Sequence, residues 1–126
     1  MPVTTSVTAA ALLAPCLNGI DREQFVICGL DAKHRIIGLN IVSVGPLTLS
    51  IVHPREVFEP LILMNASAAL CAHNHASGDP EPSAEDRALT GRIRQAGELL
   101  GITLLDHIIL GDDHTYSFAD HSWPCS

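Results

Sequence analysis

The chain has 126 residues, of which 47% are hydrophobic and only 17% are charged. This length predicts one domain with a real hydrophobic core, and the composition excludes a disordered chain. Its 14 acidic and 7 basic residues give a formal net charge of −7, which argues against binding of nucleic acid through overall charge. The one basic cluster, Arg87, Arg92 and Arg94, is interpreted as a solvated helix face.

The sequence shows no sign of secretion or of membrane insertion. No stretch approaches the roughly 20 apolar residues that a membrane-spanning helix needs. The four cysteines form no CxxC pair, so we expect a cytoplasmic protein in which most cysteines are small buried residues. Cys71 stands two residues before His73, which also makes it a weak candidate as a metal ligand.

The first half of the chain predicts a helix followed by a hairpin. Apolar residues recur at helical spacing over residues 7–17, within an N-terminal segment of residues 1–19. Segments 23–30 and 35–44 are rich in aliphatic and β-branched residues and are separated by a polar turn, which predicts paired strands. Residues 47–52 are a candidate third strand.

A second helix is predicted to begin at His53-Pro54, because proline is favoured at the first helical position. We expect it to pack broadly against a sheet, with Met64 filling the core. Its apolar stripe is expected to contain Val57, Phe58, Leu61, Ile62, Met64 and Ala68.

The second half predicts alternation of strand and helix. Residues 68–72 read as a short buried strand, and apolar spacing predicts a helix that runs from Ser83 to Leu100 and stops at Gly101. Residues 102–110 and 115–118 then pair as strands, and residues 119–126 are expected to be a loose tail. The whole pattern predicts a mixed α/β sheet with helices on its faces.

Two histidines follow the predicted strand, at positions 73 and 75. Because side chains alternate along a strand, His73 and His75 should lie on the same face and Asn74 on the other. This HxH pattern alone is weak evidence, since half-buried polar residues at a strand end would also explain it. A loop rich in glycine and proline then leads to Asp86, and three such donors predict a catalytic metal site with an open fourth position.

Asp86 has a competing structural interpretation. Ser83 and Asp86 match the capping-box pattern, in which the fourth residue reaches back to the start of the helix. Both interpretations can hold at once, and spacing alone supports them equally.

Two imidazoles and one carboxylate suit zinc best, and a water in the open position would have its pKa lowered toward about 7. Such a site needs a general base that is not itself a ligand. Glu23, at the start of the first predicted strand, fits this role. Solvated helix faces explain Glu56, Glu59 and Glu98, and Glu81 lies in the loop.

The stretch from His73 to Asp86 resembles the metal motif of JAMM (MPN+) domains, in which HxH is followed by seven residues, serine, two residues and aspartate. The spacing matches completely. Segments 53–58, 96–102 and 105–111 resemble the bacterial RadC family, and the likeness covers roughly residues 20–118.

This resemblance implies that His73, His75 and Asp86 bind zinc, that Glu23 is the catalytic glutamate, and that Ser83 is the polar group beside the metal-bound water. It implies a JAMM-type fold, related to that of cytidine deaminases, with a curved mixed sheet between helices. In JAMM peptidases the glutamate activates the water that attacks an amide carbonyl. Ser83 would then help to stabilise the oxyanion.

Two features depart from the family. Most members have proline where this chain has Ala76. This replacement leaves the ligand residues unchanged but makes the loop backbone less restricted. Many RadC proteins also carry an N-terminal helix-hairpin-helix segment, whereas only one helix is predicted before Glu23. The resemblance therefore adds no support here for a role in DNA repair.

We expect a zinc-dependent hydrolase of the metalloprotease or isopeptidase type, acting on a peptide or isopeptide substrate, in a single domain of residues 1–126. The alternative is a non-catalytic binding module, or a vestigial metal site, that acts through a protein or DNA partner. A nucleobase deaminase has little support, because the HxE and PCxxC arrangements are missing. Asp106 and His107 are either partners that orient a ligand imidazole or hydrogen-bonded strand residues, and the second interpretation is the simpler one.

Overall fold

The computed structural model describes residues 5–17, 23–45, 52–75, 77–112, 114–121 and 123. Its elements, in chain order, are α1 (Ser6–Leu17), β1 (Gln24–Leu30), β2 (Ile36–Val44), α2 (Pro54–Leu63), β3 (Ala68–Asn74), α3 (Ala84–Leu100), β4 (Thr103–Leu110) and β5 (Thr115–Ser117). Apart from Val52, the strand expected over residues 47–52 lies outside this description, as does Ala76. Within the described ranges, no helix is long and apolar enough to cross a membrane.

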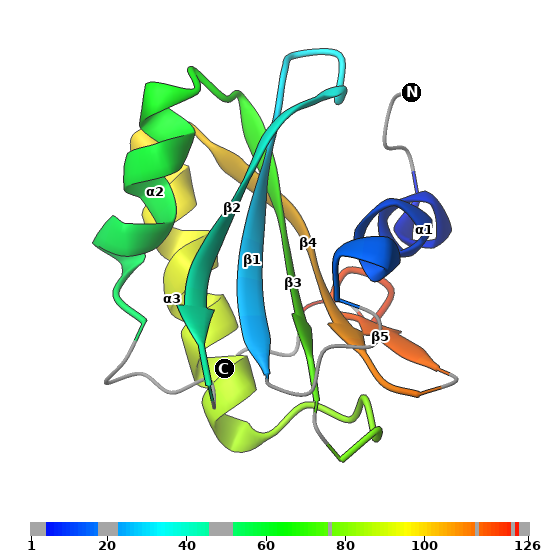
Figure 1. Ribbon diagram of the computed structural model, residues 1–126. Coiled ribbons are helices and arrows are strands. Elements are labelled where there is room, and N and C mark those ends of the chain that lie inside the picture. The colour runs from blue at the N-terminus through cyan, green and yellow to red at the C-terminus, as the bar shows by residue number, and fades with distance from the viewer. Residues whose placement is uncertain are drawn as a thin grey trace.

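The strands form one mixed sheet in the order β2-β1-β3-β4-β5. β1 is antiparallel to both β2 and β3, β3 is parallel to β4, and β5 returns antiparallel to β4. Helices α2 and α3 cover one face of the sheet and α1 covers the other (Figure 1). The predicted mixed α/β architecture, with helices on both faces of the sheet, is confirmed.

Each face of the sheet has its own core. On the α2/α3 side, Phe25 and Ile27 of β1 and Cys71 of β3 pack against Phe58 and Leu89 of the helices. On the α1 side, the alternate residues of the same strands meet a different set of apolar side chains, which includes Ala9, Leu13, Val26, Leu70 and Ile108. β3 is therefore buried along its whole length, and this explains its unbroken run of apolar residues from Ala68 to Ala72.

Local sequence signals set the ends of these elements. The Asp31 carboxylate accepts hydrogen bonds from the backbone N–H groups of Lys33 and Arg35, both at 2.9 Å, which closes the turn between β1 and β2. His53 caps α2 by accepting from the Arg55 N–H at 3.2 Å. Gly101 ends α3 in the left-handed conformation, as the sequence predicts.

The connection from β3 through α3 to β4 positions the candidate site. Because β3 and β4 are parallel, α3 must begin near the carboxyl end of β3 and run back along the sheet (Figure 1). Ligand sites in sheets of this kind lie at the carboxyl ends of the strands. His73 and the first turn of α3 therefore meet at one end of the molecule.

Two details of the expected packing are wrong. α2 ends at Leu63, so Ala68 opens β3 and does not continue the helix stripe. Ile62 is 56% exposed, because α2 buries only the narrower stripe of Val57, Phe58 and Leu61. Met64, by contrast, packs against the core on this side, as predicted.

Trp123 lies in the segment of residues 119–126 that is expected to be a loose tail, yet its ring is in contact with the rest of the fold. Its ring packs against Phe118, with 6.3 Å between the ring centroids, and the Arg94 guanidinium lies 4.3 Å from its centre. Arg94 therefore covers an aromatic ring, while Arg92 is exposed, as expected for a solvated helix face.

The left-handed Gly101 provides a test of how α3 ends. Its φ is +74°, and a Cβ there would meet no atom within 4 Å, so Gly101→Ala should destabilise the fold by about 1 kcal/mol through backbone strain alone. Gly101→Asn should cost less, because asparagine tolerates this conformation. Urea unfolding of the three proteins measures both effects. An asparagine variant less stable than the alanine variant would contradict this explanation.

Candidate metal site

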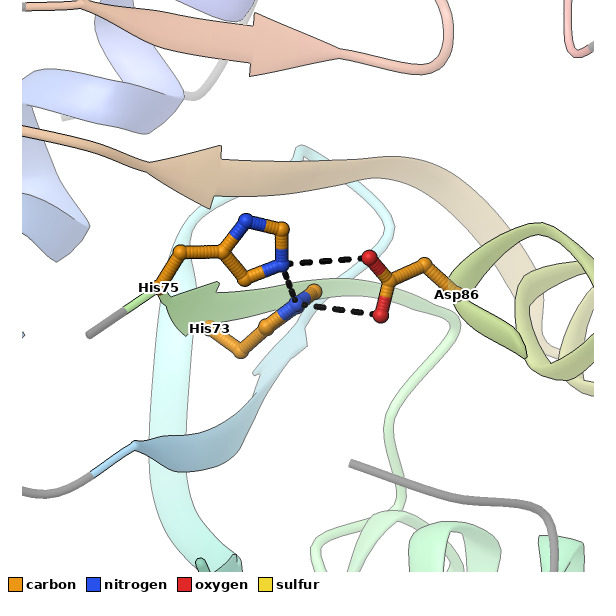
Figure 2. Close-up of side chains that lie close together, drawn as sticks. All are labelled: His73, His75 and Asp86. Atoms are coloured by element: carbon orange, nitrogen blue, oxygen red, sulfur yellow. Dashed lines mark hydrogen bonds and ion pairs between the residues drawn. The ribbon is translucent and has the colours of Figure 1, made fainter. Parts of the chain in front are cut away.

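β3 carries the first two residues of the site. His73 is the last but one residue of the strand and is 1% exposed, and Phe25 of β1 pairs with it across the sheet. His75 follows directly after the strand, and its backbone N–H donates to the Leu110 carbonyl at 3.1 Å. The backbone of His75 is thus held to β4, and both imidazoles project toward Asp86 (Figure 2).

Asp86 comes from the first turn of α3. The capping box predicted from the sequence is present: the Asp86 N–H donates to Ser83 Oγ at 3.0 Å, and the Ser83 N–H donates to Asp86 Oδ2 at 2.7 Å. These bonds fix the Asp86 side chain, which is buried and also faces both histidines. The carboxylate caps the helix and contributes to the site at the same time.

The donor atoms of the three residues lie close together. His73 Nε2 and His75 Nε2 are 3.0 Å apart, Asp86 Oδ1 is 3.4 Å from His73 Nε2, and Asp86 Oδ2 is 3.1 Å from His75 Nε2 (Figure 2). Neighbouring ligand atoms around a tetrahedral zinc ion are about 3.3 Å apart, given Zn–N bonds of about 2.0–2.1 Å. The three side chains therefore fit a metal ion, and among the described residues they are the one such group.

Electron pairs on three facing donors repel one another unless a proton or a cation lies among them. The contacts among the three side chains also shift the pKa values of His75 and Asp86. The hydrogen bond to Asp86 raises the pKa of His75 above the ordinary histidine value. Burial acts to raise the pKa of Asp86, but its close contacts with the imidazoles of His73 and His75 outweigh burial and hold that pKa well below its usual range.

The loop after His75 fixes the orientation of its ring. His75 Nδ1 lies 2.7 Å from the Asp79 carbonyl oxygen, which can only accept, so Nδ1 carries the single hydrogen of the neutral ring and its Nε2 lone pair is then left for a metal. The loop is held by the Asp112 N–H, which donates to the Gly78 carbonyl at 2.9 Å. A Cβ at Gly111 would collide with that same Gly78 carbonyl, so this close approach requires glycine.

Glu23 lies next to the site. It precedes β1, and continuing the register in which Phe25 pairs with His73 sets Glu23 opposite His75. The Gln24 N–H donates to Asn74 Oδ1 at 2.8 Å, so Asn74, which points away from the two histidines, ties the start of β1 to the end of β3. The negative charge of Glu23 also helps to raise the pKa of His75.

The other candidates lie as follows. Cys71 is fully buried in the core on the α2/α3 side and is not part of the group of donor atoms; burial raises the pKa of its thiol far above the ordinary value. Glu56, Glu59, Glu81 and Glu98 are exposed, as expected for solvated side chains.

Sequence reasoning left the role of His107 open, with the simpler interpretation preferred, and did not single out Thr90. His107 is fully buried and its Nε2 lies 2.8 Å from His73 Nδ1, so it is a partner of a site residue and more than a strand residue. Burial lowers its pKa well below the ordinary histidine value. The pairing of β4 with β3 that brings His107 there is not readable from the sequence. Thr90 is four residues after Asp86, so helical periodicity would have put both on one face.

Asp106 has a different role. Its carboxylate accepts from the Ser117 hydroxyl, from the His107 N–H at 2.7 Å and from the Ala119 N–H at 3.0 Å. Burial raises the pKa of Asp106. These bonds tie β4 to β5 and to the turn after it, so Asp106 is the hydrogen-bonded strand residue that the simpler interpretation predicts.

Comparison with known proteins identifies the family. The family model described as a RadC-like JAB domain matches residues 3–123. The chain belongs to the RadC-like JAB domain family. A UPF0758 protein of Syntrophotalea carbinolica is 52% identical over 99 residues, which cover 79% of this chain and 44% of that protein.

Other relatives agree with this assignment. A UPF0758 protein of Shouchella clausii is 48% identical over a match that covers 82% of this chain and 45% of that protein. A UPF0758 protein of Methanosarcina acetivorans is 43% identical over a match that covers 90% of this chain and 49% of that protein. This RadC-like JAB domain thus spans about half the length of the curated relatives that it matches. Their names state no activity, substrate or metal.

The site predicts an effect of removing the Asp86 charge. Asp86→Asn keeps an oxygen that can accept the Ser83 N–H, so α3 should remain capped. It removes the negative charge that faces both imidazoles. Replacing a residue that only orients a metal ligand lowers metal affinity by about 10–100-fold, so we expect replacing a ligand itself to lower zinc affinity by at least about tenfold. Competition with a chromogenic chelator measures this affinity.

Glu85→Gln is the matched control, because Glu85 is an exposed residue of the same helical turn and the change removes the same charge. It should leave zinc affinity close to that of the wild type. An equal loss of zinc affinity in the two variants would mean that only the net negative charge near the site matters. That result would contradict ligation by Asp86.

Proposed function

We propose that this RadC-like JAB domain is a zinc-dependent hydrolase that cleaves an amide or isopeptide bond of a peptide substrate. The observation that carries the proposal is the approach of His73 Nε2, His75 Nε2 and the Asp86 carboxylate to within 3.0–3.4 Å of one another. Three protein donors leave a further coordination position open, as catalytic zinc sites do.

The donor set supports zinc over other common metals. Two imidazoles favour zinc over magnesium or calcium, which prefer oxygen ligands. When bound there, zinc would polarise a carbonyl oxygen and lower the pKa of a water molecule toward about 7.

Glu23 is our candidate for the general base. The pairing of β1 with β3 supports this role, since it sets Glu23 opposite His75 and outside the group of three donors. Its carboxylate would take a proton from the attacking water and pass it to the nitrogen of the amine that leaves. A positioned acid–base group of this kind contributes about 10²–10⁴-fold to the rate.

Ser83 is our candidate for stabilising the negative charge that develops on the carbonyl oxygen. Its Oγ accepts the Asp86 N–H in the helix cap, so its own hydrogen is available for donation to a further group. The cap fixes the hydroxyl at the edge of the site before substrate arrives. A preorganised donor of this kind is worth about 10²–10³-fold in kcat.

Replacement of Glu23 tests the assignment of the base. Glu23→Gln should lower kcat by about 10²–10⁴-fold and leave the zinc content unchanged, since Glu23 is outside the donor group. The assay is a panel of peptide, isopeptide and nucleic-acid substrates with the zinc-loaded protein. Glu56→Gln, at an exposed position on α2, is the control and should retain full activity.

Three results would contradict the proposal. Activity unaffected by Glu23→Gln would refute the assigned base. A protein that binds zinc but hydrolyses none of these substrates would favour a binding module that acts through a partner. Activity on nucleic acid alone would exclude the amide substrate class.

A further inference from the structure

The buried His107 belongs to a chain of hydrogen bonds that starts and ends at residues of the candidate site. His107 Nε2 lies 2.8 Å from His73 Nδ1, and His107 Nδ1 lies 2.6 Å from Thr90 Oγ1. Thr90 Oγ1 in turn lies 2.7 Å from the Asp86 carbonyl oxygen. Side chains of β4 and α3 thus connect the imidazole of one proposed ligand to the backbone of another.

The Asp86 carbonyl fixes the direction of every bond in this chain. A carbonyl oxygen can only accept, so the Thr90 hydroxyl must donate its single hydrogen to it. Thr90 Oγ1 can then only accept from His107, which places the hydrogen of His107 on Nδ1. A neutral imidazole has one N–H, so His107 Nε2 must accept from His73 Nδ1–H.

The surroundings of His107 keep it neutral and hold its ring in place. The residue is fully buried, and an unpaired imidazolium would be costly there. The Phe118 ring stacks on it, with 5.1 Å between centroids and 15° between planes. Phe25 meets it edge-on at 5.6 Å, so the imidazole cannot turn without displacing two aromatic rings.

We propose that His107 and Thr90 are positioning residues that hold His73 in the tautomer whose Nε2 lone pair faces His75 and Asp86. Neither residue belongs to the group of three donors; they act through His73. The inference rests on the metal-binding part of the proposed function and is independent of the substrate. Residues that orient a metal-binding histidine typically change metal affinity by about 10–100-fold.

Thr90→Val tests the proposal, because valine keeps the shape of threonine and removes its hydroxyl. His107 Nδ1–H then loses its acceptor, so His107 can carry its hydrogen on Nε2 and donate to His73, which would move the hydrogen of His73 to Nε2. Thr90→Ser is the matched control, since serine keeps Oγ. The two readouts are the side-chain ¹⁵N NMR spectrum of the metal-free protein at an alkaline pH, where the histidines are neutral, and zinc affinity from chelator competition.

We expect wild-type His73 to carry its hydrogen on Nδ1. The Thr90→Val protein should show a mixture of His73 tautomers and a zinc affinity about 10–100-fold lower than that of the wild type. The Thr90→Ser protein should resemble the wild type in both measurements. A wild-type His73 protonated on Nε2 would overturn the proposal, whether or not the variants fold. So would a Thr90→Val protein with unchanged tautomer and affinity. A wild-type chain that binds no zinc would refute the proposed function, while the tautomer spectrum would still decide the role of His107.

Discussion

The central strand β3 is the constraint on which the site depends. It is hydrogen-bonded along both edges, to β1 and to β4, and all seven of its residues are buried. It cannot shift by one residue without moving its apolar side chains to the wrong face of the sheet. The positions of His73 and His75, and through the neighbouring strands those of Glu23 and His107, are therefore set by core packing.

The site concentrates polar groups at the edge of an aliphatic core. Buried imidazoles and a buried carboxylate are costly unless each atom has a partner. Here the second nitrogen of His75 is satisfied by a loop carbonyl, that of His73 by His107, and Asp86 also caps α3. The atoms that remain are those that face one another, and these three residues could hold a metal ion between them. The same contacts that stabilise the fold leave these atoms oriented for a metal.

Much of this arrangement was predictable from the sequence. The spacing of His73, His75 and Asp86, with a capping serine between them, predicted that the three would meet, and apolar periodicity predicted all the helices and strands that the structure describes. Glu23 could be proposed from its place before the first strand. Family resemblance made the donor set specific, although the ligand roles of these residues stay a prediction.

Other parts were not predictable, for definite physical reasons. The role of His107 depends on parallel pairing across a helical crossover, which no local pattern encodes. The exposure of Ile62 depends on how wide a stripe of α2 is covered by the sheet and by α3, which the spacing of apolar residues does not fix. Trp123 is held by Phe118 and by Arg94 of α3, and the contact with Arg94 joins residues far apart in the sequence, so its segment looked loose there.

The most direct test of this account is X-ray diffraction from crystals of the zinc-loaded protein, with anomalous data collected at the zinc absorption edge. The account predicts one strong anomalous peak bounded by His73 Nε2, His75 Nε2 and a carboxylate oxygen of Asp86. No peak at this position in fully zinc-loaded crystals, or a zinc ion held through Nδ1 of either histidine, would contradict it.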